Sequence, residues 1–300
     1  MHRFAQGGNS ARHCGTIQRH RYKAVNRGKG HTLRLNTAPA RDMLAAYYQT
    51  DVADPYALSD LDDFFWPHTR WWALEGDEPG VMAAALLING LHSMPILYAV
   101  APQNDTLTLE LLRLIAPELP ASLFGLLPPH AADAMPHYHF SDVAMTLRML
   151  LERTPTDHND IVSMGPAQQH IIEAFLATAY TEDEADIRLF ESYMLERWPH
   201  VACIEDEEIV SFGGTHVLTH RYAAAGIGNI VTRPDKRGGG RASRVTEALC
   251  ARLWDLGIRH IGLNVAESNT PARRCYERLG FIEKLRFIEC SLTRQSSETT

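Results

Sequence analysis

A glycine-rich loop between a strand and a helix constrains this sequence more than any other feature. Residues 228–243 run from an apolar strand, through three glycines at 238–240, into a helix. The helix is clearly signalled, because apolar residues recur on one face over 245–256 and Gly257 stands at its C-terminal cap. A helix start of this kind offers unpaired N–H groups and the positive end of the helix dipole, and glycine lets a ligand approach the backbone. The loop therefore predicts a phosphate-binding site.

Two common phosphate-binding patterns do not fit this loop. A P-loop requires GxxxxGK[ST], and no Lys-Ser or Lys-Thr closes the loop here. A dinucleotide-binding fold requires GxGxxG after the first strand of a βαβ unit, whereas the strands before this loop read as an antiparallel meander. A glycine-rich turn before a helix is also compatible with a simple tight turn, so the loop alone does not decide its function.

Charge is distributed unevenly along the chain. Residues 1–41 hold nine Lys or Arg residues and no acidic residue, whereas the rest holds 20 basic and 36 acidic side chains. The leader lacks a periodic apolar face, which predicts a disordered basic tail over residues 1–31; a transit peptide, an RNA-binding arm and sequence upstream of the true start share this composition. The acidic body argues against nucleic acid as a partner and suits an amine substrate, whose cation it attracts.

Length and cysteine content narrow the class further. With 300 residues, two domains are expected. The five cysteines are odd in number and scattered, without a CxxC pair, which indicates a reducing, cytoplasmic compartment and no zinc or redox motif. No apolar run reaches 18 residues, so no membrane-spanning helix and no membrane partner are expected.

The two halves of the chain have a similar order of elements. Residues 71–88 read as two strands around an acidic turn, and residues 201–218 repeat that pattern. This similarity favours a diverged internal duplication. Residues 103–106 of the first half, Gln-Asn-Asp-Thr, stand where the second half has its glycine loop.

A polar, aperiodic segment at residues 154–160 predicts the boundary between the halves. The expected domains are residues 32–153 and residues 160–298. Because glycines at a helix start occur only in the second domain, the phosphate site is expected there, once per chain.

Two motifs of the C-terminal half resemble those of the GNAT superfamily of acetyl-CoA-dependent N-acetyltransferases. The first is similar to the family's Gln/Arg-x-x-Gly-x-Gly/Ala signature and reads Arg237-Gly238-Gly239-Gly240-Arg241-Ala242. The second is similar to Asn-x-x-Ala-x-x-x-Tyr-x-x-x-Gly-Phe and comprises Asn269, Ala272, Tyr276, Gly280 and Phe281. Both stand in the family's order, and the resemblance covers residues 160–298. It implies an α/β (α+β) fold with a mixed, mostly antiparallel central sheet flanked by helices. Together with the similar order of elements in the two halves, it implies two tandem GNAT-like domains, of which the first is degenerate.

The resemblance also implies how the cosubstrate acetyl-CoA is held. Its pantetheine is expected in a V-shaped gap between the fourth and fifth strands, paired with the backbone of Ile230, Val231 and Thr232. Asn269 is expected to contact it near the thioester. Its pyrophosphate is expected at the glycine loop, on the segment Arg237, Gly238, Gly239, Gly240, Arg241, Ala242 and Ser243. Local signals agree with the second motif, since Thr270 is suited to cap the following helix and Pro271 to begin it.

Acetyl transfer to an amine needs a neutral amine, a donor for the oxyanion and an acid for the leaving thiolate. A backbone N–H near Ile230 or Val231 is the expected oxyanion donor. Tyr276 is the expected acid, because a phenol's pKa of about 10 suits a thiolate; the alternative is that Tyr276 only packs. The base is left open among Glu267, His216, His220 and water. His216 and His220 are expected to share one face of a strand by its period of two, but two histidines without a third ligand do not predict a metal site.

The expected activity is transfer of the acetyl group to a primary amine of a small molecule or peptide, by direct attack in a ternary complex. The competing hypothesis is a non-catalytic regulatory protein that keeps the GNAT fold and binds CoA. An RNA-associated protein acting through the basic tail is a third hypothesis. The sequence does not identify the amine, and it leaves open whether the chain forms an oligomer.

Overall fold

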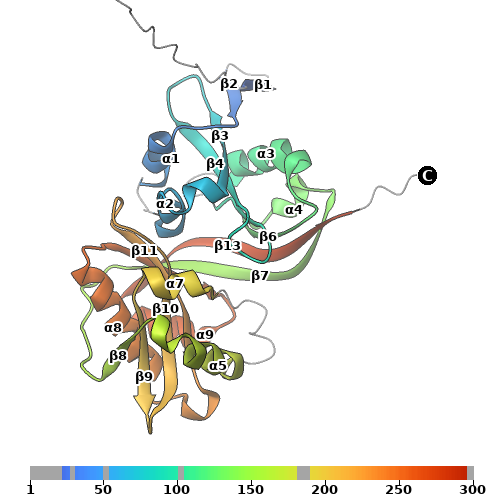
Figure 1. Cartoon of the computed structure of the whole chain (residues 1–300). Coiled ribbons are helices and arrows are strands. Elements are labelled where there is room, and N and C mark those ends of the chain that lie inside the picture. The colour runs from blue at the N-terminus through green and yellow to red at the C-terminus, as the bar shows by residue number, and fades with distance from the viewer. Residues whose placement is uncertain (1–21, 28–30, 50–53, 101–104, 181–189, 296–300) are drawn as a thin grey trace, which may run out of the picture.

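A computed structural model describes residues 22–27, 31–49, 54–100, 105–180 and 190–295. Its described strands form one 13-stranded sheet in the order β1-β2-β3-β4-β5-β6-β13-β7-β12-β11-β10-β9-β8. Helices flank this sheet on both sides of a narrow waist, at which the two halves of the chain meet (Figure 1). Among the described strands, only the pairs β5–β6 and β11–β12 are parallel. The predicted mixed, mostly antiparallel sheet with flanking helices is thereby confirmed.

The elements of the first half run from the N-terminus to the long strand at the waist. They are β1 (Tyr22–Arg27), β2 (His31–Asn36), α1 (Arg41–Tyr48), α2 (Pro55–Asp60), η1 (Trp66–His68), β3 (Thr69–Glu75), β4 (Val81–Ile88), β5 (Ile96–Tyr98), α3 (Asp105–Ile115), η2 (Ala116–Glu118), β6 (Ser122–Leu127), α4 (Ala131–Ala134) and β7 (Tyr138–Leu151).

The elements of the second half follow in a similar order. They are β8 (Ile161–Met164), η3 (Pro166–Gln168), α5 (Gln169–Ala179), α7 (Ser192–Arg197), β9 (His200–Glu205), β10 (Glu208–Thr219), β11 (Ala224–Thr232), η4 (Pro234–Lys236), α8 (Arg241–Asp255), β12 (His260–Ala266), α9 (Thr270–Arg278) and β13 (Phe281–Arg294).

Both halves contain an antiparallel hairpin followed by a strand–helix–strand crossover. In the first half the hairpin is β3–β4, and α3 connects β5 to its parallel neighbour β6. In the second half the hairpin is β9–β10, and α8 connects β11 to its parallel neighbour β12. The topology agrees with two tandem units of one type, while descent by duplication stays a prediction.

The two longest strands, β7 and β13, are exchanged between the halves. β13 ends the chain but pairs with β6 of the first half, and β7 ends the first half but pairs with β12 of the second. The two strands also pair with each other, from Phe281↔Leu151 to Arg294↔Tyr138. They cross the waist of Figure 1 side by side, in green and red. The domain boundary at residues 154–160 stays a prediction. The hydrogen-bonded sheet is continuous from one half of the chain to the other.

Ordered structure begins earlier than the sequence predicts. Tyr22–Arg27 form β1, which pairs with β2 from Tyr22↔Asn36 to Arg27↔His31. The predicted disordered tail over residues 1–31 is therefore wrong for this part, while residues 1–21 lie outside the described residues. The missed signal is the segment Gly28-Lys29-Gly30, whose two glycines favour a turn between strands.

The hydrophobic core also crosses the waist. Leu147 and Met149 of β7 belong to the same buried cluster as Ile227 of β11 and Leu263 of β12. The four described cysteines are buried free thiols at positions 203, 250, 275 and 290. Within the described ranges, no helix combines the length and apolar composition that crossing a bilayer requires.

A buried polar cluster connects the halves beside this core; it consists of Asp54, Tyr98, Arg148 and Asn264. The side chain of Arg148, on β7, is fully buried, and its Nη1 lies 2.5 Å from Oδ1 of Asp54. Its Nε donates to Oδ1 of Asn264 on β12 at 2.7 Å. Tyr98 donates to the other carboxylate oxygen of Asp54. Asp54 also caps α2, because its Oδ1 accepts the N–H groups of the next turn.

Replacing Arg148 with Met is expected to destabilise the protein by about 3–5 kcal/mol, because Asp54 is left as an unpaired buried charge. Urea unfolding followed by circular dichroism measures this loss. The matched control is the double variant Arg148→Met/Asp54→Asn, which removes both charges and keeps a residue able to cap α2. It is expected to recover most of the loss. A loss below about 1 kcal/mol in the single variant contradicts a structural role for the pair.

Candidate active site

The parallel strands β11 and β12 separate halfway along their length. They pair from Ala224↔His260 to Ile227↔Leu263, and both then continue without pairing to each other. A gap between the two strands therefore opens at Ile227. It lies where the sequence predicts the gap for acetyl-CoA.

The other edge of β11 is irregular at the same place. Gly228 pairs with Gly214 of β10, and Val231 pairs with Phe212, so two residues of β11 face one residue of β10. One of the two, Asn229, has a φ of 51°. This left-handed conformation is uncommon for a residue with a side chain, although Asn tolerates it better than most. The bulge turns the backbone of Asn229 and Ile230 out of the regular ladder beside the gap.

The glycine loop leads into the N-terminus of α8, as predicted. Gly238 and Gly240 have φ values of 84° and 75°, and Gly240 is the residue at the N-cap. A Cβ built on either glycine meets no protein atom within 4 Å, so the space beside the backbone is open. The first N–H groups of α8 have no partner inside the helix. An open cradle with free helix amides fits a pyrophosphate.

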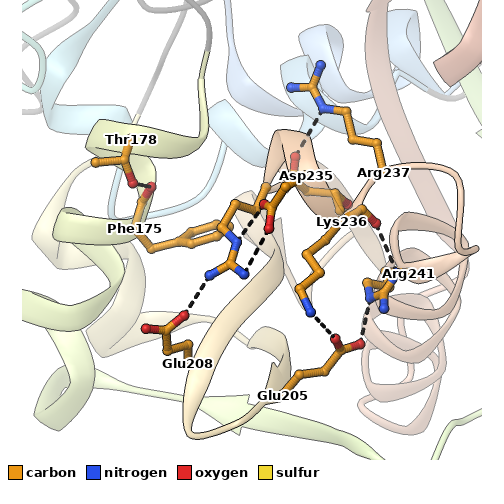
Figure 2. Close-up of polar contacts among 10 residues, drawn as sticks. Phe175, Thr178, Glu205, Glu208, Asp235, Lys236, Arg237 and Arg241 are labelled. Atoms are coloured by element: carbon orange, nitrogen blue, oxygen red, sulfur yellow. Dashed lines mark hydrogen bonds and ion pairs between the residues drawn. The ribbon is translucent and has the colours of Figure 1, made fainter.

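Ion pairs brace this loop against the β9–β10 hairpin (Figure 2). Glu205, at the end of β9, accepts from Arg241 at 2.6 Å and from Lys236 at 3.1 Å. Hydrogen bonds from these two cations lower the pKa of Glu205 to about 2. Arg233 donates to Glu208 at 2.6 Å and to Asp235 at 2.7 Å. The sequence reasoning missed Glu205, whose only signal was its place in an acidic turn.

The two arginines of the predicted pyrophosphate segment make different contacts. Nε of Arg237 donates to the carbonyl of Thr232 at 3.1 Å, and the residue is exposed. Arg241 folds back toward Glu205 and also donates to the carbonyl of Lys236 at 2.9 Å. A Cβ on Gly239 would lie 2.3 Å from Nη1 of Arg241, so this glycine makes room for the folded arginine. Ala242 and Ser243 follow in the first turn of α8.

Gly240→Val is expected to abolish acetyl-CoA binding. A branched Cβ would enter the open cradle and would strain a backbone with a φ of 75°. Isothermal titration calorimetry with acetyl-CoA measures the change. The matched control is Gly257→Val, at the other end of α8, where φ is 84° and the space is also open. The control shares the strain but not the site. Affinity within about twofold of wild type for Gly240→Val, well under 1 kcal/mol, would show that the loop is not the cradle.

The second predicted motif forms α9. Asn269, rather than the predicted Thr270, caps this helix, because its Oδ1 accepts the N–H of Ala272 at 3.2 Å. An Asn side chain at this position reaches the same amide that a Thr would. Asn269 is exposed, and its contact with acetyl-CoA stays a prediction.

Tyr276 is buried on the inner side of α9. Its ring meets Phe281 edge-on, with 5.9 Å between ring centroids. Burial raises the pKa of its phenol, and the nearby Cys275, Tyr180 and Tyr56 oppose ionisation further. The side chain therefore keeps its proton at neutral pH, which both the packing and the acid hypotheses allow.

A residue of the first half reaches the gap. The hydroxyl of Tyr56, on α2, donates to the carbonyl of Ile227 at 3.1 Å, where the pairing of β11 with β12 ends. A Cβ on Gly226 would lie 2.5 Å from the Tyr56 ring, so the strand has room for this aromatic side chain. Sequence reasoning missed this contact because Tyr56 and Ile227 are far apart in the chain.

The candidates for the base lie in different places. Glu267 pairs with Arg286 at 2.8 Å. His220 is exposed and lies beyond the end of β10, so it does not share a strand face with His216, contrary to the prediction. His216 lies on β10 with its ring against Gly228, beside the gap. Among the described residues, no group of three His, Cys, Asp or Glu is arranged to hold a metal ion.

Comparisons with known proteins agree with this geometry. Residues 168–281 match the model of the acetyltransferase (GNAT) family. Among curated proteins, none matches the chain in sequence.

Solved structures of GNAT proteins are similar in fold. A GCN5-related N-acetyltransferase from Sphaerobacter thermophilus is 17% identical, with a TM-score of 0.53, over 88% of this chain and 96% of that one. A GNAT-family acetyltransferase from Colwellia psychrerythraea is 14% identical, with a TM-score of 0.52, over 86% and 99%. A tandem GNAT protein from the clavulanic acid biosynthesis pathway is 16% identical, with a TM-score of 0.51, over 86% and 94%. Residues 168–281 therefore form a GNAT-family acetyltransferase domain, which makes this chain an acyltransferase.

Proposed function

We propose that the chain transfers the acetyl group of acetyl-CoA to a primary amine of a small molecule or peptide, by direct attack in a ternary complex. One observation carries the proposal: the gap that opens at Ile227 continues along the second half of β11, and this strand leads into an open glycine cradle. A thioester cosubstrate needs both features, since its pyrophosphate seeks helix amides and its pantetheine seeks unpaired strand groups.

Three groups of residues hold the cosubstrate in this proposal. The loop from Arg237 to Ser243 cradles the pyrophosphate. The backbone of Ile230, Val231 and Thr232 pairs with the pantetheine. Asn269 lies near the thioester. Acetyl-CoA supplies the activated acetyl group, and no metal takes part.

Residues of the chain supply the oxyanion donor and the acid. A backbone N–H near Ile230, which the bulge turns out of the ladder, or near Val231, which follows the bulge, donates to the oxyanion. Tyr276, protonated at neutral pH, donates its proton to the departing thiolate.

An amine panel tests the proposal. The full chain is incubated with acetyl-CoA and amino acids, polyamines, aminoglycosides or peptides with free N-termini, and released thiol is measured. Thiol release that depends on one class of amine supports the proposal. Tight binding of acetyl-CoA without turnover on any class would favour a regulatory CoA-binding protein instead.

Acetyl-CoA is expected to bind once per chain. In the first half, the helix corresponding to α8 is α3, and it begins with Asp105, whose negative charge opposes a phosphate. Burial raises the pKa of this carboxyl. Even when it is neutral, the described first turn of α3 offers a phosphate no basic side chain. Calorimetry with the full chain is expected to give one site, and a stoichiometry of two would contradict the assignment to the second half.

The proposal also includes the compartment and the partners of the protein. A reducing, cytoplasmic setting fits the free thiols at the four described cysteine positions. The amine substrate is the partner that we propose for this site, and acetyl transfer to it requires neither nucleic acid nor a membrane.

A further inference from the structure

Two further histidines, from separate segments, lie close enough to His216 to influence its protonation, and His216 itself lies beside the gap. His92 follows β4, His200 begins β9 and His216 lies on β10. Each has a buried ring nitrogen without a hydrogen-bond partner among the described residues: Nδ1 of His92, Nε2 of His200 and Nε2 of His216. Buried polar atoms are usually paired, so these three unpaired nitrogens need an explanation.

Two glycines on neighbouring strands make room for two of these rings. Gly214 of β10 and Gly228 of β11 pair with each other across the sheet. A Cβ on Gly214 would lie 2.7 Å from the His200 ring. A Cβ on Gly228 would lie 2.1 Å from Cε1 of His216 and 2.5 Å from its Nε2. Any larger residue at 228 would therefore displace the imidazole.

This position places His216 at the mouth of the gap. Gly228 directly follows Ile227, the last residue of β11 that pairs with β12. Nε2 of His216 thus lies against the backbone where the strands separate. In the proposed function, the acetyl group and the attacking amine meet at this place.

The hydrogen bonds of His216 determine which nitrogen carries the proton. Asn229 accepts a hydrogen bond from this imidazole. Because Nε2 has no partner, the bond comes from Nδ1. The carbonyl of Asn229 also accepts from the hydroxyl of Tyr180 at 2.9 Å, which fixes its orientation. In the neutral ring, Nε2 therefore carries the lone pair.

We propose that Nε2 of His216 accepts the proton of the attacking amine, with Asn229 as the positioning residue that holds the imidazole in the required tautomer. This proposal rests on the proposed acetyl transfer. The amine nitrogen forms a bond to the carbonyl carbon with its lone pair, and the C–S bond breaks with its electron pair leaving on sulfur. The N–H proton moves to Nε2 of His216. Tyr276 protonates the sulfur, and solvent returns a proton from His216 to Tyr276.

The surroundings keep the His216 ring neutral before the amine attacks. Burial and the neighbouring His200 and His92 lower the pKa of His216 to about 4, while the bond to Asn229 opposes this shift. Burial also lowers the pKa of His200 to about 4. Glu191, which faces Nδ1 of His92 at 3.8 Å, is the nearby carboxylate. The ring of His216 is therefore neutral at pH 6–9, and no bound proton blocks Nε2.

Nitrogen-15 NMR of histidine-labelled full-length protein tests the tautomer without any substrate. At pH 7 we expect His216 to be neutral, with the proton on Nδ1 and Nε2 unprotonated. The His216→Asn variant assigns the signal. Asn229→Ala is expected to remove the tautomer preference. A proton on Nε2 in the wild type, or a charged ring at pH 7, would overturn the proposal.

Single-turnover acetylation of hydroxylamine, a small amine nucleophile, tests the proton transfer. His216→Ala is expected to lower the rate by about 10²- to 10⁴-fold and to leave acetyl-CoA affinity within about twofold. Added imidazole is expected to restore at least part of the rate in His216→Ala alone. The matched control is His260→Ala, an exposed histidine at the start of β12, which is expected to react like wild type.

Gly228→Ala is a second route to the same defect, because it displaces the ring but keeps the imidazole. It is expected to slow the reaction, and the double variant Gly228→Ala/His216→Ala is expected to be no slower than His216→Ala. Wild-type rates in a folded His216→Ala protein would overturn the role of His216 and leave the acetyltransferase proposal standing. Absence of acetyl-CoA binding in the wild type would overturn both.

Discussion

Residues 155–300 expressed alone are expected to lack cooperative folding and acetyl-CoA binding. The fragment loses β7, which lies between β12 and β13 in the intact sheet. Besides Tyr138, β7 contributes four buried apolar side chains, Leu147, Met149, Leu150 and Leu151. At about 1.5–3 kcal/mol for each, their loss amounts to about 6–12 kcal/mol, which is comparable to the whole stability of a typical domain. Thermal unfolding and acetyl-CoA calorimetry measure the two expected losses.

The matched comparison is the fragment 136–300, which restores β7 and little else. It is expected to regain a cooperative transition, because β7 can again pair with β12 and β13. It still lacks Tyr56 and the rest of the first half, so its acetyl transfer is expected to stay below that of the full chain. A fragment 155–300 that folds cooperatively and is fully active would refute the structural role of the first half.

Local signals in the sequence predict much of this molecule. The glycine loop, the helix from residue 241 and its termination just before Gly257 follow from spacing and from residues suited to a positive φ. The two hairpins follow from apolar runs around acidic turns. Each of these features depends on residues close together in the chain, which is why pattern reasoning finds them.

Long-range features could not be predicted in the same way. The exchange of β7 and β13 leaves no mark on their sequences, because an apolar strand pairs equally well with either neighbour. Arg148 meets Asn264 across 116 positions, and Tyr56 meets Ile227 across 171. Asn229 gave a weak signal, as a polar, strand-disfavoured residue inside an apolar strand. The role of Asn229 depends on the bulge, and a bulge can be found only when the register of β10 against β11 is known.

Tyr276→Phe is expected to lower the single-turnover rate of acetyl transfer by about 10²- to 10⁴-fold, with acetyl-CoA affinity nearly unchanged. The substitution removes one hydroxyl and keeps the ring that packs against Phe281. If Tyr276 only packs, the variant should lose at most about 1 kcal/mol of stability and almost none of its rate. Single-turnover conditions are needed because slow product release would hide part of a chemical defect in kcat.

The same substitution at Tyr222 separates the two hypotheses for Tyr276. Tyr222 is also buried, and burial also raises the pKa of its phenol. Tyr222 lies, however, in the turn between β10 and β11, next to the end of β11 that pairs with β12 and not at the gap. Tyr222→Phe is therefore expected to show wild-type rates, with a similar small change in stability. A Tyr276→Phe protein that also reacts at wild-type rates, with a folded circular dichroism spectrum, would exclude Tyr276 as the acid. The proton for the thiolate would then have to come from water. The raised pKa of the Tyr276 phenol would in that case reflect only its buried position.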